Sequence, residues 1–430
     1  MRRLCAAAIA FAFLASTAAS AAEITRLASS FEDNDPFGMF INVGFERTQN
    51  REKIVREFYQ QGESQDVTEL FYTKIDQRLN LDLHIGLWKD FEFRYRLPIV
   101  FGMNQSWRYS AGTTDANSTI HNNCLQANGG VLDPNCAQTG AGSQPMWGIP
   151  NESFRGGLGN MTFGLAYAFF NQEKDDTKPT WIVSVDYEAP TADLWDPTAA
   201  TSPDARGKIG DKNHHYTFAT ALSKRLGIAD PYFKIHYTLP YRGPGWYSNC
   251  DHPDISRMGA PENCNTADWT REDTGLRLPH VGGIIFGSEF NAYEVKSAHQ
   301  KVAFDLRGIA TYVSEGRYYN ELTDLNQKLN WTQDYLQVGG QVGFVAHAAE
   351  YVQLSASATL LYNTEHTLTD ESIGKDLPDA TGKTNGTVDV TGNPRELNPN
   401  FDWRQDLVGR RFRATENWTF NLQITGTISF

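Results

Sequence analysis

The sequence lacks any long apolar run after Ala22. Its mean hydropathy is −0.47, and no later stretch approaches the roughly 20 apolar residues that a membrane-spanning helix needs. A helical membrane protein is therefore excluded. Two classes remain: a soluble exported protein, or a membrane β-barrel whose apolar residues are spread through alternating strands.

Cysteine is also scarce, with five in the chain. Cys5 falls in a predicted signal peptide, and the other four lie in polar loops as two close pairs. An oxidising compartment favours disulfides among them. Three connectivities are possible, and the simplest pairs Cys124 with Cys136 and Cys250 with Cys264. Because C-x-x-C spacing is missing, no metal site is expected.

Signatures of catalysis are missing as well. The sequence has no G-x-S-x-G, no P-loop and no H-E-x-x-H. His214 and His215 near Thr217 come nearest to a base beside a nucleophile, and their spacing is weak evidence. The net charge of −13 argues against nucleic acid. We therefore expect no catalytic residue, no cofactor and no nucleic-acid partner.

The N-terminus has the composition of a secretory signal. Met1-Arg2-Arg3 is basic, Leu4 to Ala15 is apolar, and Ala19-Ser20-Ala21 and Ser20-Ala21-Ala22 are small-residue cleavage sites. This pattern predicts a signal peptide over residues 1–22. It is followed by a periplasmic segment, 23–36, which is too short for a plug domain and could enter a lumen only as a peptide.

From residue 37 to 430 the chain follows one rhythm of alternating apolar and polar residues, with no linker and no repeat. Period-two alternation is typical of strands. Twelve such segments are expected, near 37–48, 70–87, 91–103, 158–170, 180–190, 213–224, 231–241, 281–293, 301–313, 334–346, 350–363 and 417–430.

The spacers between these segments alternate strictly between short and long. The short ones are 88–90, 171–179, 225–230, 294–300 and 347–349, and the long ones are 49–69, 104–157, 191–212, 242–280, 314–333 and 364–416. Outer-membrane barrels have this arrangement, with short periplasmic turns, long extracellular loops and an even number of strands. One of the two longest loops, 104–157 or 364–416, is a candidate to fold inward as a constriction.

The two faces of each segment differ in chemistry. On one face residues such as Leu79, Leu81 and Leu83 are apolar, which suits lipid. Aromatic residues gather near segment ends, as an interfacial girdle requires; the examples are Trp88, Trp181, Tyr293, Tyr351 and Trp418.

The other face carries too many charges for a dry core. The candidate lumen-lining residues are Asp76, Arg78, Asp82, His84, Glu92, Arg94, Arg96, Asp186, Glu188, Lys234, His236, Glu289, Asp305 and Arg307. A turn at 88–90 places Asp82 opposite Arg96 and His84 opposite Arg94, where opposite charges contribute about 0.2–1 kcal/mol. Two interpretations stay open: the charges brace a plugged barrel, or they line a pore and set its selectivity.

The chain ends on a strand of strict alternation that includes Trp418 and Phe420 and finishes at Phe430. Such an ending resembles the assembly signal of Gram-negative outer-membrane barrels. The resemblance implies that these three residues are read by the barrel-assembly machinery.

Residues 156–193 contain Gly157-Leu158-Gly159-Asn160 and, beyond two expected strands, Pro190-Thr191-Ala192-Asp193. This stretch resembles the GLGD and PTG signature of the MetA-pathway phenol-degradation family of outer-membrane proteins, with a single substitution in each motif. The resemblance implies a barrel and a channel for small organic compounds. It gives no catalytic residues.

The prediction is an all-β protein: a single transmembrane antiparallel barrel in a Gram-negative outer membrane. Its partners would be outer-membrane lipids, the assembly machinery and small-molecule solutes. The expected function is a channel for small molecules, including hydrophobic or aromatic compounds. The alternatives are a surface barrel whose disulfide-stapled loops bind a partner, and an outer-membrane lipid hydrolase.

Overall fold

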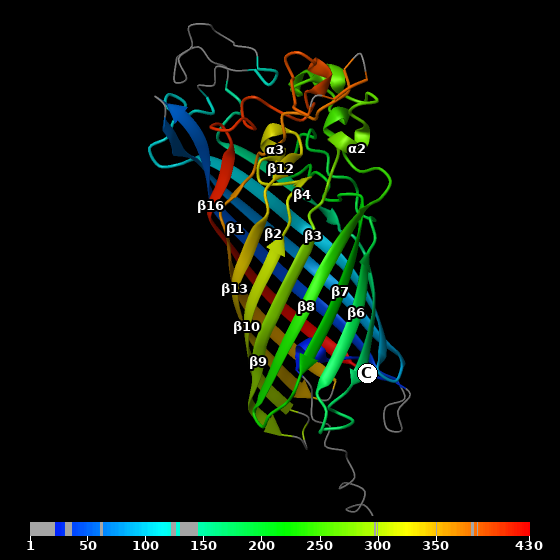
Figure 1. The fold of residues 1–430 in the computed structure, drawn as a ribbon. Coiled ribbons are helices and arrows are strands. Elements are labelled where there is room, and N and C mark those ends of the chain that lie inside the picture. The colour runs from blue at the N-terminus through cyan, green and yellow to red at the C-terminus, as the bar shows by residue number, and fades with distance from the viewer. Residues whose placement is uncertain are drawn as a thin grey trace, which may run out of the picture.

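Twelve strands form a closed antiparallel ring in the computed structural model, which describes residues 22–30, 37–60, 63–121, 126–129, 145–295, 298, 300–349, 351–379, 382–384 and 386–430. β1 pairs with β16 from Phe40 opposite Ser429 to Arg56 opposite Phe412, and this pairing closes the ring. In order around the ring, the strands are β1 (Met39–Gln60), β2 (Glu63–Trp88), β3 (Phe91–Tyr109), β5 (Thr162–Phe170), β6 (Thr180–Glu188), β7 (Asn213–Ser223), β8 (Ala229–Arg242), β9 (Val281–Val295), β10 (Gln300–Val313), β13 (Tyr335–Ala349), β14 (Val352–Asn363) and β16 (Phe412–Ser429). Figure 1 shows them steeply tilted along the barrel.

The predicted barrel of twelve strands is confirmed, and so is the grouping of its connections. The short turns lie at the end where the two chain termini of the barrel meet, with the Met39 amide donating to the Phe430 carbonyl at 3.1 Å and the Phe430 amide donating to the Met39 carbonyl at 2.9 Å. The long connections gather at the opposite end (Figure 1). By the rule for such barrels, the end with the short turns is periplasmic.

The predicted loop 49–69 was wrong. β1 and β2 continue through it as a hairpin whose register runs out to Gln60 opposite Glu63. The strands extend because their inward side chains pack, above the membrane, against residues of the extracellular loops. Ile54 and Leu70 are fully buried in a cluster with Trp107 and Phe412, beneath the loops.

Small elements occupy several of the predicted long loops. They are β4 (Asn151–Leu158), which pairs with β3, the hairpin of β11 (Gly316–Tyr318) and β12 (Asn330–Thr332), β15 (His366–Thr367), which pairs with β16, and the short helices η2 (Asn249–Asp251), η3 (Ile255–Arg257), η4 (Pro261–Asn263), α2 (Arg271–Thr274), α3 (Thr323–Asn326) and η6 (Pro394–Glu396). None of the helices in the described part of the chain is long and apolar enough to cross a membrane.

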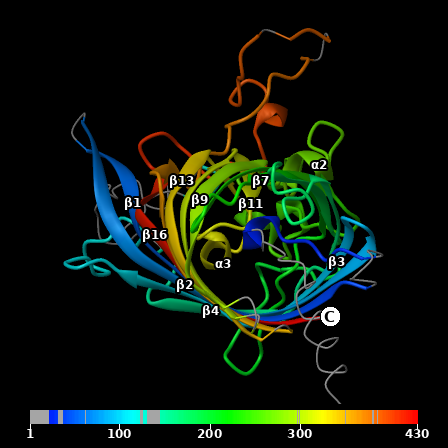
Figure 2. The same cartoon turned by 90° about the horizontal axis from the view of Figure 1, so that it is seen from below.

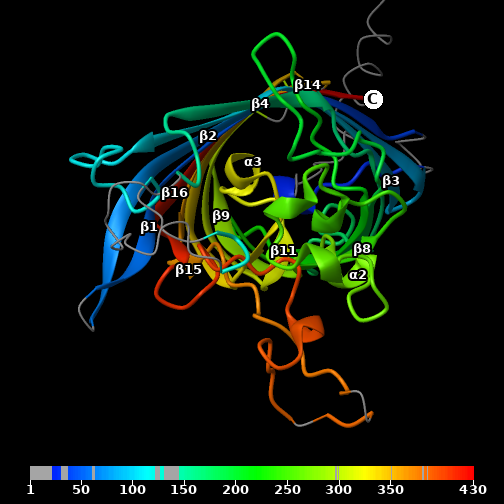
Figure 3. The ribbon, with the colours of Figure 1, turned by 90° about the horizontal axis from the view of Figure 1, so that it is seen from above.

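The loop between β10 and β13 enters the extracellular mouth. Seen from either end, its helix α3 lies inside the ring (Figures 2 and 3). Leu322 and Leu325 from this loop are buried in the cluster beneath the loops. The candidate loops 104–157 and 364–416 supply partners to the same cluster, among them Ile120 and Leu368, so they pack around the inserted segment.

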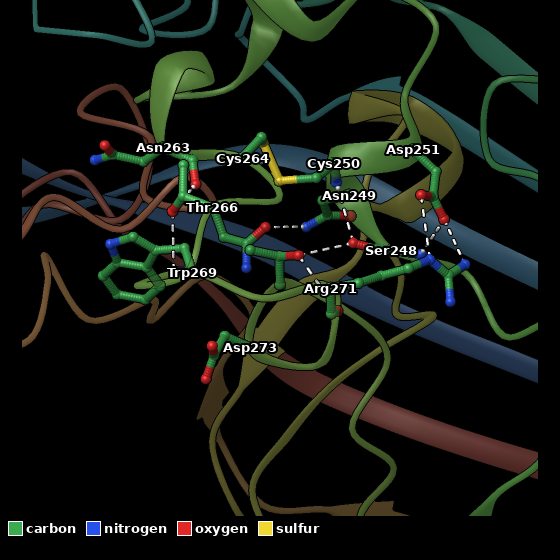
Figure 4. Close-up of a disulfide and its surroundings, with 12 residues drawn as sticks. Ser248, Asn249, Cys250, Asp251, Asn263, Cys264, Thr266, Trp269, Arg271 and Asp273 are labelled. Carbon is green, nitrogen blue, oxygen red and sulfur yellow. Dashed lines mark hydrogen bonds and ion pairs between the residues drawn. A yellow bond between two sulfur atoms is a disulfide. The ribbon is translucent and has the colours of Figure 1, made fainter. Parts of the chain in front are cut away.

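The connection between β8 and β9 carries a disulfide between Cys250 and Cys264, which confirms that predicted pair. Cys124 and Cys136 lie outside the described residues. Figure 4 shows the disulfide within a tight polar loop, where the Arg271 guanidinium pairs with Asp251 at 2.6 Å. The neighbouring Asn249 donates to the Leu329 carbonyl at 3.0 Å and accepts from its amide at 2.7 Å. The disulfide loop is therefore joined to the loop that enters the mouth.

Replacing both Cys250 and Cys264 with serine should loosen this loop without opening the barrel. The bond closes a loop with a sequence separation of 14, and a cross-link of that length stabilises by about 3 kcal/mol in the chain-entropy account. We expect trypsin to cleave near Arg257 and Arg271 much faster, while heat-modifiable migration of the barrel on gels is unchanged. Equal cleavage of the oxidised and serine forms would contradict this.

Candidate functional site: the barrel lumen

The predicted cross-strand pairs on the inner face are observed. β2 and β3 place Asp82 opposite Arg96 and His84 opposite Arg94. The Arg96 Nε lies 2.6 Å from Asp82 Oδ1. In place of the expected three-residue turn, a two-residue turn, Lys89-Asp90, and a bulge between Gly86 and Trp88 give the same offset and set this register. A slip by one residue would turn the apolar side chains of one strand inward.

Further ion pairs form along single strands. The Arg78 guanidinium lies 2.5 Å from Asp76 Oδ2. Glu92 is fully buried and accepts from Arg94 Nε at 2.5 Å, with His84 Nδ1 at 3.3 Å. His84 therefore contacts the diagonal carboxylate and not Arg94, as expected for two groups that can both be cationic.

Strands β6, β8, β9 and β10 carry the remaining candidates. Arg307 pairs with Asp305, which also accepts from the Tyr232 hydroxyl. Lys234 on β8 lies within electrostatic range of Asp186 and of Arg94 and Arg96 on the far strand β3. Glu188 accepts a hydrogen bond from Asn160 at 2.9 Å, and Glu289 accepts one from the Glu23 amide at 2.6 Å. The ring of His236, the last candidate, packs over Gly283 and lies 2.5 Å from where a Cβ on that glycine would be.

The outward-facing side chains are apolar, in contrast to the charged side chains of the lumen. Large apolar residues are exposed around the outer wall, for example Val43, Leu165 and Phe304. The aromatic residues predicted for the girdle are exposed as well: Trp88, Trp181, Tyr293, Tyr351 and Trp418. A closed ring satisfies the strand hydrogen bonds internally, which spanning a lipid bilayer requires.

The chain is an outer-membrane β-barrel. Its outer face suits lipid and its inner face suits water, and the ring has no free edge. Trp418, Phe420 and Phe430 lie exposed on the outer face of the closing strand or at its end. Their role as an assembly signal stays a prediction.

Two cavities in the lumen are lined by residues that the structure describes. The larger, about 350 Å³, is lined by both charged and apolar side chains. Its charged residues include Glu46, Asp76, Arg78, Arg96, Glu188 and Asp211, and its apolar residues include Pro98, Val100, Met103 and Ile209. The smaller, about 150 Å³, lies toward the periplasmic end beside Asp305, Arg307 and Gln353.

A buried ion pair holds the inserted loop at the extracellular mouth. The Asp324 carboxylate on α3 faces Arg155 on β4 at 2.6 Å, and their side chains are 4% and 1% exposed. Asp324 also accepts from Gln105 at 2.9 Å, from the Trp195 indole at 2.8 Å and from the Ser153 hydroxyl. The mouth is therefore narrowed by a segment tied to the wall and to a neighbouring loop.

The N-terminal segment narrows the periplasmic end. η1 (Glu23–Thr25) lies inside the ring (Figure 2). Thr25 shares a hydrogen bond with Ser223 on β7 at 2.7 Å, and the Ala28 amide donates to Glu92 at 2.5 Å. Arg26 donates to Ser429 on β16 at 3.0 Å. These contacts reach strands on different sides of the lumen, so this short peptide crosses it.

Sequence reasoning missed several of these residues. Glu46 on β1 accepts from Asn80 at 3.1 Å and Asn421 at 2.8 Å, and the alternation of Ile41, Val43 and Phe45 could have placed it inward. Asp324 and Arg155 fall in predicted loops, where no periodic pattern marks them.

The weak catalytic candidate does not assemble in the described structure. The Thr217 hydroxyl pairs with Thr238 at 2.8 Å, and His215 pairs with Asp211 at 3.0 Å. His214 stacks on Tyr187. Among the described residues, no group of three or more His, Cys, Asp or Glu side chains is placed to hold a metal ion.

The extracellular cap contains a buried carboxyl group that should respond to pH. Burial, together with the nearby carboxylates of Glu371 and Asp402, raises the pKa of Asp406 to about 7 in spite of Lys328. The Lys328 ammonium lies 3.8 Å from Asp406, which also accepts from the Asp402 amide at 2.8 Å.

We expect the cap to weaken as pH rises. The folded pKa of Asp406, about 7, exceeds its ordinary value of 3.8, so its contribution to stability is complete below about pH 4 and is lost as pH rises through about 7. Protease cleavage of the loops should accelerate between pH 5 and pH 8, and Asp406→Asn should flatten that profile. A pH profile identical in the two proteins would contradict the assignment.

No family model matches the sequence, and no curated protein matches it. Solved structures resemble it in shape. An outer membrane channel from Pseudomonas putida F1 aligns with a TM-score of 0.42 and 9% identity over 91% of this chain and 95% of that one. The TodX monoaromatic hydrocarbon channel aligns with a TM-score of 0.30 and 10% identity over 92% of this chain and 91% of that one. The outer membrane protease OmpT from Escherichia coli aligns with a TM-score of 0.28 and 8% identity over 94% of this chain and 100% of that one.

Proposed function

We propose that the barrel is a diffusion channel for small organic molecules that combine a charged group with an apolar part. The observation that carries the proposal is the larger lumen cavity, which is lined by both charged and apolar side chains. Arg78 and Arg96 offer guanidinium groups that bind carboxylates well. Pro98, Val100 and Met103 offer a surface for an aromatic or aliphatic body.

The polar lumen favours such solutes over pure hydrocarbons. A hydrocarbon gains nothing from displacing water beside Asp82 and Arg96, whereas an aromatic acid satisfies both kinds of surface. The inserted loop and the N-terminal segment limit the size of the solute. The function is therefore passage of small amphipathic compounds through a narrow, charge-lined path.

Charge substitutions in the lumen should change ion selectivity in opposite directions. Arg96→Ala leaves Asp82 unpaired and should favour cations, whereas Asp82→Ala should favour anions. One charge at ~4 Å in water is worth about 1 kcal/mol, so we expect about a fivefold change in permeability ratio. The measurement is the reversal potential of the refolded barrel in a planar bilayer, under a salt gradient.

Asp254→Asn on an exposed loop is the matched control and should leave the reversal potential unchanged. Liposome swelling then separates solutes: an aromatic carboxylate should enter faster than a neutral sugar of equal size. A folded barrel that never conducts would overturn the channel and favour the surface barrel whose loops bind a partner.

A further inference from the structure

A row of three carboxylates lies on the lumen wall near the periplasmic end. Asp230 on β8 is directly opposite Glu289 on β9, and Glu289 is opposite Asp305 on β10. Their exposed fractions are 2%, 1% and 2%. Like charges directly across strands destabilise a sheet, and a buried charge needs a partner.

Side-chain cations neutralise only part of the negative charge of these three carboxylates. Arg307 pairs with Asp305, and Arg225, the other cation near Asp230, pairs with Glu294 at 2.6 Å. Lys301 lies 4.0 Å from Glu289. Two carboxylates thus share one lysine. Asp230 Oδ1 and Glu289 Oε2 have no hydrogen-bond partner among the described residues.

The start of the N-terminal segment meets these carboxylates. The Glu23 amide donates to Glu289 Oε1 at 2.6 Å, and the Ala22 amide donates to Asp230. Ala22 is fully buried, and its carbonyl accepts from the Thr25 amide at 2.8 Å. The first backbone nitrogens of this segment therefore point at the carboxylates that lack a full set of partners.

Both small-residue cleavage sites in the sequence end at this point. Hydrolysis after Ala21 or after Ala22 by a signal peptidase consumes one water, leaves a carboxylate on the leader and leaves an amine on the mature chain. That amine has an ordinary pKa of about 7.7–8.0 and is mostly protonated at neutral pH. It supplies one positive charge and three N–H donors.

We propose that Asp230 and Glu289 form a binding site for the α-ammonium group of the processed chain, which locks the N-terminal segment across the periplasmic mouth. Cleavage after Ala21 keeps the Ala22 carbonyl and its hydrogen bond from the Thr25 amide, which favours a mature chain that starts at Ala22. A start at Glu23 places the same group against Glu289. In the uncleaved precursor the site receives neutral amides only, so the lock forms with maturation.

Two glycines leave room for the rest of the segment. A Cβ on Gly86 would lie 2.4 Å from the Ala28 carbonyl oxygen, and one on Gly38 would lie 1.9 Å from that of Ser29. Gly86→Val therefore offers a way to displace the segment while both carboxylates stay intact.

The test measures protection of the terminal amine in the native, full-length mature barrel. Intact mass locates the first residue, and an aldehyde reagent selective for α-amines measures its reactivity at neutral pH. We expect a first residue at Ala22 or Glu23, and labelling at least about tenfold slower in the folded barrel than after heat unfolding, as for a group exposed only by local opening.

Asp230→Asn with Glu289→Gln, and separately Gly86→Val, should each remove the protection. Thr25→Ser, which keeps its hydroxyl, should not. A first residue elsewhere would overturn the proposal, as would an amine that labels equally fast in the folded and unfolded wild-type protein. Neither readout depends on conduction, so failure of the channel proposal leaves this test intact.

Discussion

Asp324→Ala should release the loop that narrows the extracellular mouth and raise conductance several-fold. The substitution leaves Arg155, which is 1% exposed, with its charge unpaired in the cap. Removing one partner of a buried pair costs about 3–5 kcal/mol. Moving the loop outward hydrates Arg155 and relieves that cost, so displacement of α3 is the expected response.

Single-channel recording and protease cleavage within the loop measure the two consequences separately. Asp193→Ala is the matched control, because its pair with Lys208 is exposed and should not matter. Asp324→Asn should fall between, since an amide keeps part of the hydrogen bonding. Wild-type conductance together with wild-type resistance to protease in Asp324→Ala would show that this pair does not hold the loop.

Deleting residues 23–30 should open the periplasmic mouth. The deletion removes a peptide that bonds to β7, β9 and β16 across the lumen. Water then reaches Glu92 and Glu289, so the barrel is not left with dry unpaired charges. The ring itself stays closed because the Met39 and Phe430 backbones still pair. We expect the conductance to rise and the gel migration of the folded barrel to be unchanged.

The two constrictions lie in series, so each limits flow when the other is open. Asp324→Ala combined with the deletion should therefore exceed the sum of the two single increases. Thr25→Ser serves as the conservative control for the N-terminal segment. If the deletion changes the conductance neither of the wild type nor of Asp324→Ala, the segment does not obstruct the path.

The outer wall and the charge ladder were predictable because they follow local rules. Alternation at Leu79, Leu81 and Leu83 sets a face, and the short turn with its adjacent bulge then sets which residues oppose one another. Asp82 and Arg96 lie opposite one another, as predicted. The pairing of His84 with Glu92 was not expected, because direct opposition says nothing about which diagonal neighbour a side chain selects.

The extent of the extracellular strands was misjudged for a related reason. Segment 49–69 has weak alternation, and its strands persist because Ile54 packs with Trp107 and Phe412 from distant parts of the chain. Burial supplied by the loops overrides a weak local pattern, as tertiary context commonly does for strands.

The sequence by itself determined a closed barrel of twelve strands, its lipid face, its charged lumen and the end that carries the long loops. Each depends on period-two alternation and spacer length, which are local. Only the tertiary structure decided which loop enters the mouth and where the N-terminal segment docks. Asp324 bonds to Arg155 across 169 residues and Glu23 to Glu289 across 266. Contacts at such separations depend on how the ring closes, and no local period encodes them.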